Sequence, residues 1–261
     1  MYNPYFNLKG NGVPILSNKQ IEKDAMAFIK DFDPDMFENP HALDIDAFVE
    51  MYLGLDVDFL YLRRDDSLLG EMIFQNFNNY PVFSPIKLNI ELISVKRGTM
   101  LINETLEREK KASLRRTTMG HEAGHWIYHQ TYFSNGNKAC RDSEREINRK
   151  RLVTEQDWLE HHANLFGAAI LMPLRPFVRT VMDERTRALA WRDVDLIGQI
   201  LVGDQSLAYT AAKVFHVSES AAMIRLHQLK LDILSEAKYV GGDKMKKVYY
   251  CDDYPEEEDA L

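Results

Sequence analysis

The stretch "TMGHEAGHWIYHQ", residues 118–130, places a histidine at every fourth position and an acid directly after the first one. On an α-helix, residues four apart lie on the same face. His121 and His125 can therefore offer ring nitrogens to one metal ion at the usual zinc–nitrogen distance of about 2.0–2.1 Å. Glu122 points about 100° further round the helix, beside the water that such a metal would bind. This HExxH pattern is typical of a hydrolytic zinc site with the glutamate as general base.

Three fixed residues within five positions also arise by chance, on a helix whose histidines lie on a solvated face. Gly124 argues against that alternative, because a glycine inside a helix costs about 1 kcal/mol relative to alanine. We therefore expect a second helix or a substrate chain to approach closely at Gly124.

The third histidine of the stretch, His129, cannot bind the same ion on a straight helix, because eight residues rise about 12 Å. The metzincin pattern would need a glycine at position 128 and a histidine at position 131, where Tyr128 and Thr131 stand. The third ligand must therefore come from another element. We interpret His129 as a packing or hydrogen-bonding residue, with a contact to a metal ligand or to substrate as the alternative.

A second helix is expected at about residues 155–172, in "EQDWLEHHANLFGAAILMP", and it ends at Pro173. At 100° per residue, Glu160 lies on a face with two very small neighbours, and this face can pack against Gly124. Glu160 is therefore the preferred third ligand. Asn164, one turn later, is the preferred residue to orient a ligand. The alternative ligands are His161, on the opposite wet side, and His162, in the apolar stripe.

The predicted first shell is thus His121, His125 and Glu160, with water in an open fourth position. Two histidines and a carboxylate around an open site suit a catalytic zinc ion. Iron and manganese stay open as alternatives, since affinity alone does not decide which metal is loaded. The residue that would stabilise an oxyanion is not fixed by the sequence, and the candidates are His129, Tyr128 and Tyr132.

The composition restricts the class of protein. The chain has 261 residues, a net charge of −8 and two cysteines, which argues against a disulfide framework and mildly against nucleic acid as the main partner. The first residues lack the basic and apolar regions of a signal peptide, and no run of about 18 apolar residues indicates a membrane span. We expect a cytoplasmic protein with no membrane partner.

Periodicity predicts the order of the elements. Helical spacing occurs near residues 21–32 and 45–53, and period-two alternation begins with "LDVDFLYL" at residues 55–62. Further strands are expected at residues 68–74, 88–95 and 99–103, the last two joined by a turn at 96–98. Helix returns over 104–130, a polar loop covers 131–154, and more helices follow residue 173 as far as about 237. The acidic residues 239–261 are expected to be disordered.

The sequence resembles the ImmA/IrrE family of metallo-endopeptidases. The likeness rests on "TTMGHEAGHWIYH" followed by "EHHANLFGAAILMP", with Gly167 where alanine is usual, and on "TMLIN" and "AAKVFHVSESAAMIRLHQLKL". It runs from about residue 18 to 232. The resemblance implies a helix-rich α+β fold with a zincin-like core and a small antiparallel sheet. The expected regions are an irregular arm (1–17), the metalloprotease domain (18–174), a helical C-terminal region (175–238) and the acidic tail (239–261).

The resemblance also implies a substrate, namely a helix-turn-helix transcriptional repressor of a mobile element or a stress regulon. The C-terminal stretch 204–231 itself reads as two helices around a turn, with Ser218 as an N-cap. Its second helix offers mainly Arg225 and Lys230 as cations, which are few positive charges for binding the phosphates of DNA. We therefore favour packing or protein recognition over DNA binding there. Two alternative functions remain, a transcriptional regulator with a structural or sensory metal site, and a metal amidase for small molecules.

Overall fold

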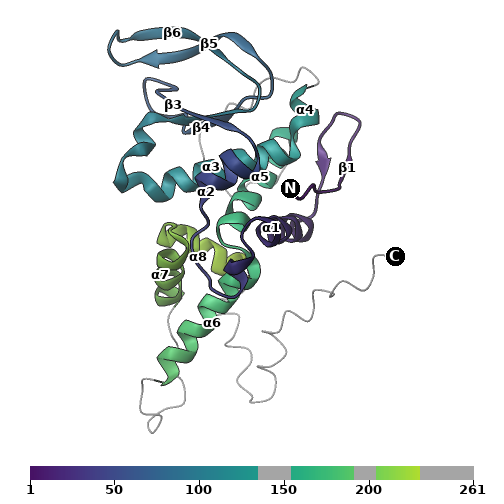
Figure 1. The fold of residues 1–261 in the computed structure, drawn as a ribbon, viewed down its shortest axis with the longest axis vertical. Helices are drawn as coiled ribbons and strands as arrows, with labels where there is room; N and C mark the ends of the chain where they lie inside the picture. Colours follow the sequence, from purple (N-terminus) through teal and green to yellow (C-terminus); the bar gives the residue numbers. More distant parts are fainter. Residues whose placement is uncertain (135–153, 191–203, 230–261) are drawn as a thin grey trace.

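The computed structural model describes residues 1–134, 154–190 and 204–229, without the side chains of 186–190. The strands between residues 56 and 103 gather at one end of the molecule (Figure 1). The other end holds α6 (Leu174–Ala190), α7 (Asp204–Phe215) and α8 (Glu219–Gln228), and between the two ends lie α3 (Ala112–Tyr128) and α5 (Glu155–Leu171). The expected helix-rich α+β fold is confirmed. The predicted loop 131–154 is wrong at its start, because residues 131–134 belong to the short helix α4 (Gln130–Ser134). Residues 135–153 lie outside the described residues, as does the whole of the acidic tail.

A three-stranded sheet supports the metal-site helix. Its strands are β3 (Asp56–Leu60), β7 (Thr99–Asn103) and β4 (Gly70–Met72), in the order β3-β7-β4. β4 runs antiparallel to β7, as expected, but β3 runs parallel to it. Parallel strands need a long crossover, and here β4 and a hairpin occupy the chain between them. All five residues of β7 are buried, so this strand forms the centre of the layer.

The hairpin consists of β5 (Phe77–Ser84) and β6 (Asn89–Val95), which pair antiparallel in a sheet of their own. The turn predicted at residues 96–98 is present, and Gly98 adopts a left-handed φ of +88° that favours glycine. This turn joins two strands of different sheets, because β6 pairs with β5 whereas β7 pairs with β3 and β4. The residues 68–74 predicted as one strand pair as β4 over their middle three.

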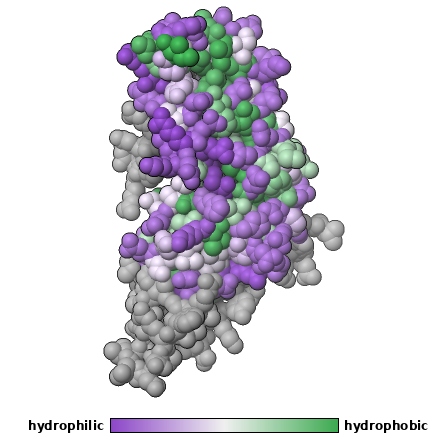
Figure 2. Space-filling model, turned by 60° about the vertical axis from the view of Figure 1, so that its left-hand side comes forward, coloured by the Kyte–Doolittle hydropathy of each residue, from purple (hydrophilic) through white to green (hydrophobic). Residues whose placement is uncertain are grey.

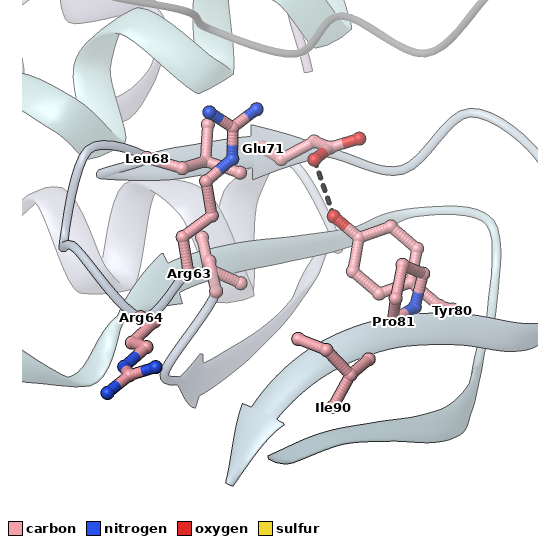
Figure 3. A pocket seen from close by; sticks show the side chains of 8 residues that line it. Arg63, Arg64, Leu68, Glu71, Tyr80, Pro81 and Ile90 are labelled. Carbon is pink, nitrogen blue, oxygen red and sulfur yellow. Dashed lines mark hydrogen bonds between the residues drawn. The ribbon is translucent and has the colours of Figure 1, made fainter. Parts of the chain in front are cut away.

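The hairpin covers the face of the central sheet that is turned away from α3. A small apolar cluster lies there, separate from the main core, and it includes Leu101, Ile73 and Tyr80. Buried Glu71 accepts a hydrogen bond from the Tyr80 hydroxyl at the edge of a cavity of about 200 Å³ (Figure 3). The guanidinium groups of Arg63 and Arg64 point in opposite directions beside it, so they do not converge on one ligand.

The outer side of the hairpin is apolar and exposed. Figure 2 shows this surface at the top of the molecule. The exposed fraction is large for its apolar side chains Ile86, Leu88 and Leu92. Ile90 is also exposed, and it lines the cavity beside Glu71.

The helices follow the predicted order. The N-terminal ones are α1 (Asn18–Phe32), the 3₁₀ turn η1 (Pro34–Phe37), α2 (Ile45–Ala47) and the π-turn η2 (Phe48–Tyr52). Before the metal-site helix stand two 3₁₀ turns, η3 (Glu104–Glu107) and η4 (Glu109–Lys111). The remaining helices are α3 (Ala112–Tyr128), α4 (Gln130–Ser134), α5 (Glu155–Leu171), α6 (Leu174–Ala190), α7 (Asp204–Phe215) and α8 (Glu219–Gln228). Residues 1–17 contain only the short strands β1 (Asn7–Leu8) and β2 (Pro14–Ile15).

Local signals explain the limits of α5. Thr154 accepts a hydrogen bond from the backbone N–H of Asp157, whose carboxylate accepts one from the backbone N–H of Thr154. This capping box satisfies two free N–H groups at the start of the helix. Pro173 follows the last turn, where a proline cannot continue the helical hydrogen-bond ladder. Within the described residues no single helix is long and apolar enough to span a membrane, and α5 and α6 pass that test only as a pair bent by 54°.

Close packing of α3 on α5 brings the two halves of the site together. A Cβ on Gly124 would lie 3.0 Å from the Ala163 Cα, and a Cβ on Gly167 would lie 2.9 Å from the backbone nitrogen of His121. Gly120 faces Gly167 in the same way, with only 3.3 Å to its Cα. The prediction that a second helix approaches at Gly124 is confirmed. Residues larger than glycine at these points would push the helices apart.

The C-terminal helices pack onto the same core. Arg225 of α8 is fully buried and donates through Nη1 and Nη2 to the two carboxylate oxygens of Glu22 on α1, at 2.5 and 2.7 Å. Its Nε donates to the backbone oxygen of Met172, just after α5. Ser218 caps α8 as predicted, accepting from the backbone N–H of Ala221. Arg225 thus joins three separate parts of the chain.

Candidate metal centre

Two helices bring two imidazoles and one carboxylate to a single point. His121 and His125, on α3, are both buried, and Glu160 reaches them from α5. The Nε2 atoms of the two histidines lie 2.9 Å apart, and the Glu160 oxygens lie 3.3 Å from His121 and 3.6 Å from His125. One atom from each side chain lies within 4.8 Å of the others, so the group could hold a metal ion.

The donor set and its spacing fit a tetrahedral ion. Bonds of about 2.0–2.1 Å at tetrahedral angles place neighbouring ligand atoms about 3.3 Å apart, close to the distances in this cluster. The His121 Nδ1 lies 3.0 Å from the Asn164 side-chain oxygen. That oxygen only accepts, so the ring proton of His121 is on Nδ1 and the lone pair of Nε2 faces Glu160 and His125. His121 therefore has the tautomer that a metal ligand needs.

The carboxylate of Glu160 is ionised in this setting. Burial raises its pKa, but the contacts with His121 and His125 outweigh burial and hold the pKa well below its usual range. Gln156, one turn earlier on α5, donates from its side-chain amide to Glu160 Oε1 at 2.7 Å. The sequence reasoning did not single out Gln156, although its spacing of four residues from Glu160 is a detectable signal.

Glu122 follows His121 on α3 and is not part of this group. Its side chain is 1% exposed and packs against β4, where a Cβ on Gly70 would lie 3.0 Å from Glu122 Oε1 and 2.6 Å from Thr118 Cγ2. Gly70 therefore leaves the space that the Glu122 carboxylate occupies. Sequence reasoning missed Gly70, because its contact with Glu122 spans 52 residues of sequence and only the tertiary fold brings the two together.

His129 follows the last residue of α3 and contacts a member of the cluster. Its Nδ1 lies 2.9 Å from the Nδ1 of His125, and its backbone N–H donates to the His125 carbonyl at 2.9 Å. The His129 ring is completely buried, and burial holds its pKa well below the usual range of histidine. Its ring lies 5.8 Å from that of His162, which is also buried. His129 is thus a hydrogen-bonding residue beside His125.

The alternative third ligands do not join the cluster. His161 is directed to Asn18 on α1, with 2.9 Å between its Nε2 and the Asn18 side-chain oxygen. His162 stacks on His129, and burial, aided by the nearby His161 and Lys9, lowers its pKa to about 4. Within the described residues, Glu160 is the carboxylate that meets His121 and His125.

All three candidates for oxyanion stabilisation have other hydrogen-bond partners. His129 contacts His125, as described above, and the buried Tyr128 hydroxyl donates to Asp24 at 3.0 Å. Tyr132, on α4, is half-buried and its hydroxyl lies 3.3 Å from the Glu155 carboxylate at the start of α5. Tyr132 is the most exposed residue of the three.

Comparisons with known proteins add no relative. No family model matches the chain, and no curated protein matches it. The geometry of the cluster is consistent with a zinc site of the HExxH type. The narrower assignment to one family of endopeptidases stays a prediction from the motifs.

Proposed function

We propose that this chain is a zinc-dependent endopeptidase of the kind that its motifs resemble, the ImmA/IrrE family. The observation that carries the proposal is the convergence of His121, His125 and Glu160 from two packed helices, with Glu122 next to His121 in the sequence of α3. Three protein ligands leave a tetrahedral ion with one open position, which is the arrangement of catalytic zinc sites. A structural zinc site is usually closed by four protein ligands.

Each side chain has a defined task in this proposal. His121, His125 and Glu160 would hold the ion, which supplies a Lewis acid and acidifies a water molecule near it. Glu122 accepts the proton of the attacking water and later delivers it to the leaving amine. Asn164 accepts the hydrogen bond from His121 Nδ1 and keeps that ring turned to the ion. Burial of Glu122 keeps competing solvent away from the proton transfer.

For the substrate we propose a helix-turn-helix transcriptional repressor of a mobile element or a stress regulon, encountered in the cytoplasm. This part of the proposal rests on the family resemblance of the two motifs. The alternative, a DNA-binding regulator, finds little support in α8. Arg225 is buried against Glu22 and cannot reach a phosphate, while Lys230 lies outside the described residues. The packing of α7 and α8 on the core favours the peptidase.

The deciding experiment compares the wild type with Glu122→Gln. Zinc content is measured by elemental analysis, and hydrolysis with a fluorogenic peptide library, then with intact helix-turn-helix repressors and small amides. We expect the variant to keep its zinc and to lose cleavage by a factor of about 10² or more, the usual contribution of a general base. Glu107→Gln, at an exposed position before α3, serves as the control and keeps full activity.

Unchanged turnover by Glu122→Gln would overturn the proposal, as would a wild-type protein that binds no divalent ion. Cleavage of small amides without cleavage of peptides would replace the endopeptidase by an amidase.

A further inference from the structure

Three buried imidazoles lie in a row that begins at the metal centre. The Nδ1 atoms of His125 and His129 are 2.9 Å apart, and the rings of His129 and His162 stack with 5.8 Å between centroids and 27° between planes. Their exposed fractions are 0%, 0% and 1%. Such a row is not needed for packing alone, since apolar side chains fill a core without polar atoms to satisfy.

The proton positions along this row follow from the metal centre. His125 turns its Nε2 to His121 and Glu160, so a bound ion takes the lone pair of that nitrogen. The ring proton of neutral His125 is then on Nδ1 and must be donated. The atom opposite is His129 Nδ1, which accepts only when its own proton is on Nε2. The contacts of His125 Nε2 with the cluster and of His125 Nδ1 with His129 thus fix the tautomers of His125 and His129.

The buried ring of His129 has its side-chain contact with His125 through Nδ1. Within the described residues, His129 Nε2 and both ring nitrogens of His162 have no hydrogen-bond partner. His129 therefore makes one side-chain hydrogen bond there, and it makes it to His125.

We propose that His129 is a positioning residue that accepts the hydrogen bond of the metal ligand His125 and so fixes that ring towards the ion, an inference that rests on the proposed zinc function. Zinc-bound histidines usually donate to a carboxylate, a backbone carbonyl or water. In this protein a second imidazole takes that place, and His162 packs against its face. His121 receives the matching support from Asn164.

Two substitutions separate the hydrogen bond from the packing. His129→Phe keeps a flat ring in the stack but has no acceptor, whereas His129→Asn keeps an acceptor near the position of Nδ1 but loses the ring. His161→Asn, a change of the neighbouring histidine that faces Asn18, is the matched control. For each full-length protein, zinc affinity is measured by competition with a chromophoric chelator, and the visible spectrum is recorded with cobalt(II) in place of zinc.

We expect His129→Phe to weaken zinc binding about 10- to 100-fold, the usual effect of losing such a partner, and to shift the cobalt spectrum. His129→Asn loses less affinity than His129→Phe, and the control binds as the wild type does. Zinc binding by His129→Phe at wild-type affinity, or tighter binding by the phenylalanine form than by the asparagine form, would overturn the positioning role.

Circular dichroism of the metal-free forms checks that each variant is folded. If the phenylalanine ring is not accommodated, His129→Leu carries the same expectation, because it also lacks an acceptor. The experiment distinguishes failure of the proposed zinc function from failure of the positioning role of His129. A wild-type chain that binds no zinc removes the proposed function together with this inference, whereas an unaffected phenylalanine variant removes the inference alone.

Discussion

Asp24 on α1 is a buried carboxylate that connects three parts of the molecule. It accepts hydrogen bonds from the hydroxyl of Tyr2, the side-chain amide of Gln20 and the hydroxyl of Tyr128, at 2.8, 2.8 and 3.0 Å. These bonds lower its pKa, but the cost of burying the charge is larger, so the pKa is raised above the usual range of aspartate. Asp24 thereby links the N-terminal arm to the last turn of the metal-site helix.

This raised pKa predicts the sign of a pH effect on stability. Between the usual aspartate pKa of about 3.9 and the raised one, the folded protein keeps a proton that the unfolded chain releases. The wild-type free energy of unfolding therefore falls as pH rises through this window. Asp24→Asn removes this dependence, so its stability relative to the wild type should increase with pH. Urea denaturation of both proteins at a series of pH values measures the difference.

The control for this experiment is Asp65→Asn. Asp65 is exposed, and hydrogen bonds from Ser67 lower its pKa, so any effect of its removal has the opposite sign. A constant difference in stability between wild type and Asp24→Asn across the pH series would contradict the prediction.

Single residues of the site were predictable where the chemistry is local. His121, His125 and the preferred ligand Glu160 followed from helical spacing, because i and i+4 positions share a face whatever the rest of the fold does. The role of His129 was left between packing and contact with a ligand, and its bond to His125 depends on the way α3 ends at Tyr128. The contact of Gly70 with Glu122 could not be predicted, since no local sequence pattern near Gly70 indicates that Glu122 packs against it.

At the scale of elements, the contact between α3 and α5 sets the geometry of the cluster. Gly167 stands where the family that the motifs resemble usually has alanine, and here a Cβ would lie 2.9 Å from the His121 nitrogen and 3.1 Å from the Gly120 carbonyl carbon. Both are backbone atoms of α3 and cannot rotate away. The spacing of these two helices is therefore specific to the glycines of this chain.

Gly167→Ala is predicted to destabilise the protein. The added methyl group overpacks the helix interface, which typically costs about 1–3 kcal/mol, and the shift of α5 also displaces Glu160 and weakens zinc binding. Chemical denaturation and chelator competition measure the two effects. Gly10→Ala is the matched control, because its Cβ would meet nothing within 4 Å. A Gly167→Ala protein as stable as Gly10→Ala would show that α5 moves aside without cost.

Elements with clear periodicity were predicted well, and the others were not. The bounds expected for α5, about residues 155–172, agree with Glu155–Leu171 because a capping box and Pro173 mark its ends. β5 was missed, since Asn78, Asn79 and Pro81 in "FNNYPVFS" interrupt the pattern of a strand. Its formation depends on pairing with β6 and on the apolar cluster beneath. The parallel pairing of β3 with β7 is likewise a tertiary outcome.

At the scale of the whole molecule, Arg225 and Glu22 join the two ends of the described chain. Their side chains are 0% and 9% exposed, so loss of one partner leaves a charge in the interior. We predict that Arg225→Met lowers the free energy of unfolding by about 3–5 kcal/mol, whereas the double change with Glu22→Met recovers most of it. Urea denaturation measures both.

Arg179→Met provides the comparison, because Arg179 pairs with Glu38 at the surface, with exposed fractions of 46% and 80%. That pair should contribute no more than about 1 kcal/mol. Equal losses from Arg179→Met and Arg225→Met would contradict the assigned importance of the buried pair.

The ion pair between Glu22 and Arg225 has a consequence for folding during synthesis of the chain. Glu22 and Arg225 are separated by 203 positions, so Glu22 leaves the ribosome long before Arg225 does. During that interval the Glu22 carboxylate lacks the guanidinium with which it pairs in the folded protein, and burying it on α1 costs free energy. A nascent polypeptide stalled ahead of α8 should therefore be digested by proteases that spare the finished protein.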